Sequence, residues 1–262
     1  TVREGNQKVL VIMVDFGGQQ FSTEPQKYHD MLFSSGVDSV NSWLKDQSKG
    51  KLQISAAPTT QEGMPAGVVK VTVDPSIVSG HVGTKAYEEQ KILAEEAIKK
   101  AKDLVNWSEI DKDGNGTFVD SFHGDYVNPV NEELTIATIF PGNTDSNGTG
   151  ANGPESWPHL SQVNTSLESE GKTYNFRNVS IITSEKVDGI PVQTSILGHE
   201  YLHSLGARDM YKDRDSIGAW SIMDKAYGNR EGEETGNHLT PVDPLHKRSE
   251  ERRVGKECPR CV

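Results

Sequence analysis

Six consecutive apolar residues, Val9 to Val14, constrain the fold of this 262-residue chain more than any other feature. The run is rich in β-branched side chains and ends at Asp15 and a Gly-Gly pair, which predicts a strand followed by a turn. Alternate residues of a strand point to opposite faces, so an uninterrupted apolar run predicts burial on both faces. We therefore expect a buried strand at the centre of a sheet.

Hydrophobic periodicity predicts the other elements. The clearest is a helix over residues 85–105, where Leu93, Ala97, Ile98 and Ala101 keep a period of 3.6 residues. Further helices are expected over residues 28–33, 39–47 (with Ser39 as N-cap) and 192–205, and further strands over residues 52–54, 68–73, 134–140 and 175–183. Strands and helices do not alternate regularly along the chain, which indicates an α+β fold.

The composition limits the partners. The formal net charge is −11, and such an acidic surface disfavours nucleic acid and anionic membranes but suits calcium. No apolar run approaches the roughly 20 residues of a membrane span. We expect a soluble monomer that does not insert into membranes.

The last fifteen residues differ from the rest in composition. Both cysteines, Cys258 and Cys261, lie there, and no second pair exists to complete a four-cysteine metal site. The segment from Arg248 to Cys258 looks like the translation of a sequencing-library adaptor. We therefore expect a catalytic domain over residues 1–247 and a non-native tail over residues 248–262; the alternative is a genuine basic tail.

Residues 199–209 have the spacing of a metal site. His199 and His203, four residues apart on a helix, project from one face and can bind one metal ion. Glu200 is rotated by about 100 degrees and can contact a water molecule on the metal. Gly206 allows the helix to end in a left-handed turn that returns Asp209 as a third ligand, with a fourth position open to water. The alternative is a surface helix with two solvated histidines and a glycine cap.

These motifs resemble one family. The series H-E-x-x-H-x-x-G-x-x-D, followed by Tyr211 and by Trp220-Ser-Ile-Met223, is similar to the M6, or immune inhibitor A-like, family of secreted bacterial metallopeptidases. The likeness spans roughly residues 8–240 and includes segments 9–16, 31–33, 48–54 and 157–159 and the Asp-rich loop at residue 111.

The resemblance implies a zincin- or metzincin-like fold, with a mixed sheet, an active-site helix and a Met-turn at Met223. It implies zinc bound by His199, His203 and Asp209, with Glu200 as general base for a zinc-activated water that hydrolyses peptide bonds. It also implies a secreted, extracellular enzyme acting on proteins or peptides. The family continues into a further lobe, so we expect the domain over residues 1–247 to be incomplete at its C-terminal side.

Two tyrosines are candidates for stabilising the oxyanion of the reaction, Tyr211 and Tyr227. The alternative for each is a purely structural role, because neither has the spacing at which metzincins keep their tyrosine.

The Asp-rich loop is a candidate calcium site. Asp111, Asp113 and Asn115 stand at loop positions 1, 3 and 5, followed by Gly116 and Thr117. Asp120 stands at position 10, whereas an EF-hand loop closes with a glutamate at position 12. The alternative is an Asp/Asn/Gly turn without metal.

Two other functions remain open. One is an inactive, calcium-stabilised binding or adhesion domain, although such pseudo-enzymes commonly lose the base or a ligand, and here all four groups are present. The other is a zinc hydrolase of another class, such as a carboxypeptidase, which would need a cationic pocket for a terminal carboxylate. An open cleft beside the loop over residues 141–154 would favour an endopeptidase.

Overall fold

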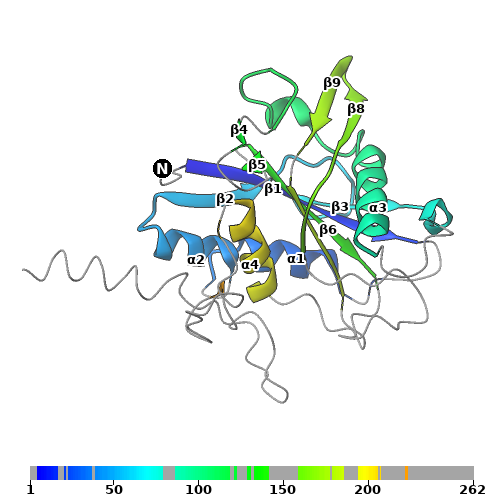
Figure 1. Ribbon diagram of the computed structural model, residues 1–262. Coiled ribbons are helices and arrows are strands. Elements are labelled where there is room, and N and C mark those ends of the chain that lie inside the picture. The colour runs from blue at the N-terminus through cyan, green and yellow to red at the C-terminus, as the bar shows by residue number, and fades with distance from the viewer. Residues whose placement is uncertain are drawn as a thin grey trace, which may run out of the picture.

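Figure 1 shows the computed structural model of the chain. It describes residues 5–16, 21, 23–36, 39–78, 86–118, 121–122, 129–130, 133–141, 159–177, 179–185, 194–205, 207 and 222–223. The helices are α1 (Pro25–Phe33), α2 (Val40–Gln47), α3 (Ala86–Lys100) and α4 (Thr194–Ser204), with short 3-10 helices η1 (Pro75–Val78) and η2 (Trp107–Glu109). The strands are β1 (Gly5–Asp15), β2 (Leu52–Ala56), β3 (Val68–Thr72), β4 (Ser121–Phe122), β5 (Pro129–Val130), β6 (Leu134–Phe140), β7 (His159–Gln162), β8 (Thr165–Ser169), β9 (Lys172–Phe176) and β10 (Val179–Ser184).

Strand β1 is an interior strand of a six-stranded mixed sheet. It pairs in parallel with β6 along one edge and with β2 and then β3 along the other. Strand β10 extends the sheet in parallel beyond β6, and the antiparallel β7 ends it among the described strands. The buried strand predicted from the apolar run is confirmed, although β6 rather than β1 lies at the middle of the strand order. The mixture of helices and sheet agrees with an α+β fold.

Gly67 lets two strands share one edge of β1. Strand β3 begins along β1 close to the point where β2 ends. Gly67, just before β3, has a φ of 75°, a backbone conformation that glycine adopts without strain. A Cβ atom there would lie 2.8 Å from the Cβ of Ala56. The close passage therefore needs a residue without a side chain.

The two faces of the sheet build two separate cores. On β1, Leu10, Ile12 and Val14 face α3, whereas Val9, Val11 and Met13 face α1, α2 and α4. These side chains are at most 1 % exposed, as expected for a parallel strand that is covered on both sides. Figure 1 shows α1, α2 and α4 gathered together, with α3 apart from them.

Helix α4 is held to the sheet by buried polar contacts as well as by packing. The hydroxyl of Tyr201 donates a hydrogen bond to the side-chain oxygen of Gln7 on β1. The hydroxyls of Ser204 and Thr135 on β6 lie 3.3 Å apart. Because a helix packed only through apolar side chains can rotate at little cost, these contacts favour one rotation of α4.

The structure differs from the predicted elements at residues 159–169, where β7 and β8 were not predicted, at residues 175–183 and at the end of the long helix. Residues 175–183 do not form one strand. Tyr174 and Phe176 belong to the antiparallel β8–β9 pair, whereas Ile181 and Ile182 belong to β10 in the main sheet. Alternation predicts extended backbone but not the partner with which each part pairs. The predicted helix over residues 85–105 ends at Lys100, because residue 105 instead forms a β-bridge with Thr59.

No helix in the described part of the chain is long and apolar enough to cross a membrane.

We expect Tyr201→Phe to lower the free energy of unfolding by about 1–2 kcal/mol, because it removes the hydroxyl that donates a hydrogen bond to the buried side chain of Gln7. Tyr174→Phe is the matched control, since Tyr174 is also fully buried but its hydroxyl makes no hydrogen bond to another described residue. Urea unfolding of the two variants measures the difference. Equal losses in both would contradict the assigned contact.

Candidate metal centres

The imidazole rings of His199 and His203 face each other on α4. Their Nε2 atoms are 3.1 Å apart, and the ring centroids are 4.6 Å apart in an edge-on arrangement. Two nitrogens that each lie about 2.0–2.1 Å from one tetrahedral zinc ion are separated by roughly 3.3 Å. The pair therefore has the separation of two ligands of a single ion.

Backbone carbonyls determine which nitrogen of each ring is available. Nδ1 of His199 lies 2.7 Å from the carbonyl oxygen of Ile222, and Nδ1 of His203 lies 2.8 Å from that of Ala207. A carbonyl oxygen only accepts, so each Nδ1 carries the proton and each neutral ring has its lone pair on Nε2. Two lone pairs facing each other repel unless a cation lies between them, so the tautomers inferred from these acceptors suit a metal ion.

The surroundings of the pair are buried. His199 is 3 % exposed and Glu200 5 % exposed, and Met223 is buried in the same core cluster as Tyr201 of α4. The carbonyl of the neighbouring Ile222 accepts a hydrogen bond from His199, so residues 222–223 belong to the surroundings of the pair. The Ile222 and Ala207 contacts could not be predicted from the sequence, because both acceptors are backbone atoms.

Several predicted residues lie outside the described part of the chain. These are the third zinc ligand Asp209, the oxyanion candidates Tyr211 and Tyr227, and the calcium candidate Asp120. The predicted tail over residues 248–262 and nearly all of the loop over residues 141–154 lie outside it as well. Their roles stay predictions.

The Asp-rich loop is folded around its own side chains. The Asp111 side chain accepts a hydrogen bond from the backbone N–H of Gly116 at 3.0 Å. The side chain of Asp113 accepts one from the backbone N–H of Asn115 at 3.0 Å, and that of Asn115 accepts one from the backbone N–H of Thr117 at 2.7 Å. Gly116 has a φ of 75°, and a Cβ there would lie 2.7 Å from the carbonyl oxygen of Thr173. The glycine thus lets the loop dock against β9.

A third carboxylate lies beside this loop and belongs to a residue that the sequence analysis did not propose as a ligand. Glu133, just before β6, joins Asp111 and Asp113, and one oxygen of each lies within 4.8 Å of the others. Glu133 also accepts the backbone N–H of Lys112 at 3.0 Å. Carboxylate oxygens from a loop and a neighbouring strand are the donors that hard divalent cations prefer. Nothing in the sequence indicates this partner, because Glu133 is remote from the loop along the chain.

Lys172 on β9 reaches into the same loop. Its ammonium group donates to Oδ2 of Asp111 and, at 2.8 Å, to the carbonyl oxygen of Gly114. Burial raises the pKa of Asp111, but the hydrogen bond and charge of Lys172 and the Gly116 N–H outweigh it, so the net pKa lies below its usual 3.8. The hydrogen bond to Asp111 raises the pKa of Lys172 above its usual 10.5.

Comparison with protein-family models matches residues 2–258 to the catalytic domain of the immune inhibitor A peptidases, family M6. The chain belongs to the M6 peptidase family. No curated protein and no solved structure shows a significant match. Membership confirms the resemblance seen in the sequence and supports a metallopeptidase function, with a metal cofactor and protein or peptide substrates. The match runs beyond residue 247, and the predicted domain boundary there stays a prediction.

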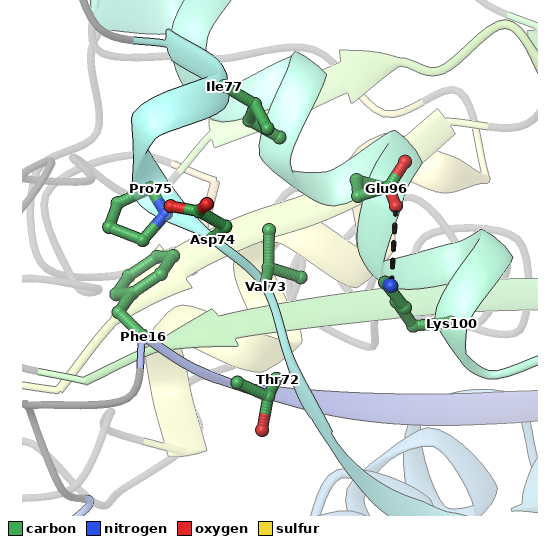
Figure 2. Close-up of a pocket in the computed structure, with 8 residues that line it drawn as sticks. All are labelled: Phe16, Thr72, Val73, Asp74, Pro75, Ile77, Glu96 and Lys100. Carbon is green, nitrogen blue, oxygen red and sulfur yellow. Dashed lines mark ion pairs between the residues drawn. The ribbon is translucent and has the colours of Figure 1, made fainter.

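A hollow of about 490 Å³ lies away from the histidine pair of this M6 domain (Figure 2). It is lined by Phe16, Thr72, Val73, Asp74, Pro75, Ile77, Glu96 and Lys100. Phe16 and Val73 belong to the core on the α3 face of the sheet, whereas α4 packs on the other face. The hollow is therefore separate from the candidate zinc site.

We expect Lys172→Met to lower the melting temperature of the metal-free protein at neutral pH, because it removes the partner of buried Asp111. The stabilisation by a lowered carboxyl pKa is present above pH 3.8 and is lost as the pH falls through the lowered pKa. The stabilisation by the raised pKa of Lys172 is present below pH 10.5 and is lost as the pH rises through that raised pKa.

The difference in melting temperature between Lys172→Met and the unmodified chain should thus be largest between these limits and shrink outside them. Lys112→Met, which removes an exposed lysine of the same loop, is the matched control. A difference that does not change with pH would contradict the ion pair as its cause.

Proposed function

We propose that this M6 domain is a zinc-dependent endopeptidase whose zinc ion is bound by His199, His203 and Asp209. The observation that supports this most is the pair of Nε2 atoms 3.1 Å apart, with both Nδ1 atoms engaged by backbone carbonyls. This is the arrangement in which two neutral histidines offer lone pairs to one ion. Asp209 follows the helix end at the spacing that returns a carboxylate to the same ion.

The proposed chemistry assigns each group one task. Zinc at this position would act as a Lewis acid toward the scissile carbonyl and would make a water molecule more acidic. Glu200, next to His199 and buried, takes the proton from the attacking water and passes it to the leaving amine. We assign Met223 to a Met-turn, because it is buried under α4 and its neighbour Ile222 holds His199. Tyr211 and Tyr227 are kept as candidates for oxyanion stabilisation.

An endopeptidase is favoured over a carboxypeptidase by the edge of the sheet. Strand β7 ends the sheet among the described strands, and α4 packs against β7 and β10. The open edge of a strand can pair with an extended peptide through backbone hydrogen bonds, which need no chain terminus. A carboxypeptidase would need a cation to bind the terminal carboxylate. An inactive binding domain is disfavoured because His199, His203 and Glu200 are all present and buried or half-buried on one helix.

Two further assignments go with this function. We propose that the loop over residues 111–117 binds calcium through Asp111, Asp113 and Glu133 as a structural ion, because their carboxylates converge there. We also propose an extracellular location, where calcium is abundant and where an acidic surface keeps a protein soluble.

His203→Ala should reduce the zinc content of the purified protein to a small fraction of one ion per chain, because it removes one of three protein ligands. His29→Ala is the matched control, since His29 lies on α1 and bonds the carbonyl of Ala66. Elemental analysis after dialysis measures both. Full zinc content in His203→Ala would exclude this site.

Glu200→Gln should keep the zinc content and lower kcat by about 10²–10⁴-fold, because an amide cannot accept the proton of the attacking water. Glu168→Gln, an exposed substitution on β8, is the matched control for the loss of one carboxylate. Cleavage of an internally quenched peptide measures kcat. Unchanged turnover in Glu200→Gln would overturn the assigned base.

A peptide blocked at both termini should be cleaved internally by the zinc-loaded chain, and chelation should abolish cleavage reversibly. Mass spectrometry of the products identifies the bond. Cleavage only of peptides with a free terminal carboxylate would instead favour the carboxypeptidase.

A further inference from the structure

The acidic loop already holds a positive charge. The ammonium group of Lys172 bonds a carboxylate oxygen of Asp111 and the carbonyl oxygen of Gly114, so it contacts the loop through two oxygens. A divalent cation in a short Asp-rich loop is bound by the same kinds of oxygen. Lys172 thus occupies part of the coordination that such an ion would need.

The loop keeps unused capacity for a cation. Asp111 is only 5 % exposed, and its second oxygen, Oδ1, is buried and has no hydrogen-bond partner among the described residues. A buried carboxylate oxygen without a partner is costly. The carboxylates of Asp111, Asp113 and Glu133 carry three negative charges, of which Lys172 neutralises one, whereas a divalent ion would neutralise two.

The ammonium group lies nearer to solvent than the carboxylate that it contacts. The Lys172 side chain is 37 % exposed, whereas that of Asp111 is fully buried. Its flexible stem starts from the turn between β8 and β9, and the ring of Tyr174 offers a second contact 5.3 Å from the ammonium nitrogen. A small ion that bound Oδ2 of Asp111 would lie close to the ammonium group and repel it strongly.

We propose that Lys172 is the resident cation of the loop over residues 111–117 in the metal-free protein, and that Ca²⁺ binds there by displacing it. The exchange rests on the proposed calcium role of this loop, and it makes calcium binding weaker than the carboxylates alone would give. Calcium binding then removes the contacts of Lys172 with the loop, whereas the backbone hydrogen bond from Asn175 on β9 to Gly116 remains.

Calcium titration of the zinc-loaded chain by calorimetry tests the exchange. Lys172→Met should bind Ca²⁺ at least tenfold more tightly than the unmodified chain. Lys112→Met, which removes one lysine charge from the same loop but leaves Lys172 in place, should change the affinity by no more than about threefold. Equal affinity of Lys172→Met and the unmodified chain would overturn the exchange and leave the calcium site standing.

A second measurement uses the unmodified chain and does not depend on the folding of a variant. Amine acylation followed by mass spectrometry should label Lys172 several-fold faster at saturating Ca²⁺ than without it, while the labelling of exposed Lys112 stays constant. Unchanged labelling of Lys172 at saturating Ca²⁺ would show that the ion and the lysine coexist, against the proposal. Absence of calcium binding by all three proteins would overturn both the exchange and the calcium site, whereas zinc content and peptidase activity test the catalytic proposal separately.

Discussion

The fold depends on β1, a strand that is hydrogen-bonded along both edges and buried on both faces. Its backbone pairs with β6 on one side and with β2 and β3 on the other, so its polar groups are satisfied without water. Its side chains can then all be apolar, and alternation divides them between two cores. Both cores depend on this strand, because each combines three β1 side chains with residues of the neighbouring strands and of the helices that cover that face.

The candidate zinc site is built on one of these faces by progressively more local contacts. Apolar packing brings α4 to the sheet, but the side-chain contacts of Tyr201 with Gln7 and of Ser204 with Thr135 favour one rotation of the helix. The Ile222 and Ala207 carbonyls then fix the tautomers of His199 and His203. The packing, the polar contacts and the carbonyl acceptors thus restrict the position of the helix, its rotation and the orientation of the two rings in turn. A packed helix can therefore place two metal-binding nitrogens accurately.

The sequence allowed prediction of what depends on short-range patterns. The buried strand at Val9–Val14, the N-cap at Ser39, which accepts the Ser42 N–H, and the shared face of His199 and His203 all follow from residues close together in the chain. The pairing of β10 with β6 and the arrival of Glu133 and Lys172 at the Asp111 loop depend on contacts between distant residues, for which one sequence contains no periodic signal. The backbone acceptors of the histidines were equally beyond prediction, because any residue supplies a carbonyl.

The two candidate cation sites differ in the charge of their donor groups in the metal-free protein. At α4 the donors are neutral imidazoles, and their backbone partners leave lone pairs whose mutual repulsion is modest. At the Asp111 loop the donors are carboxylates, and three negative charges gathered around the buried carboxylate of Asp111 would be unfavourable without a counter-ion. A lysine from the adjacent hairpin meets that need at the second site and is not required at the first. The presence of Lys172 beside the carboxylates, on the opposite face of the sheet from α4, therefore follows from the electrostatics of an acidic loop that must fold before it binds metal.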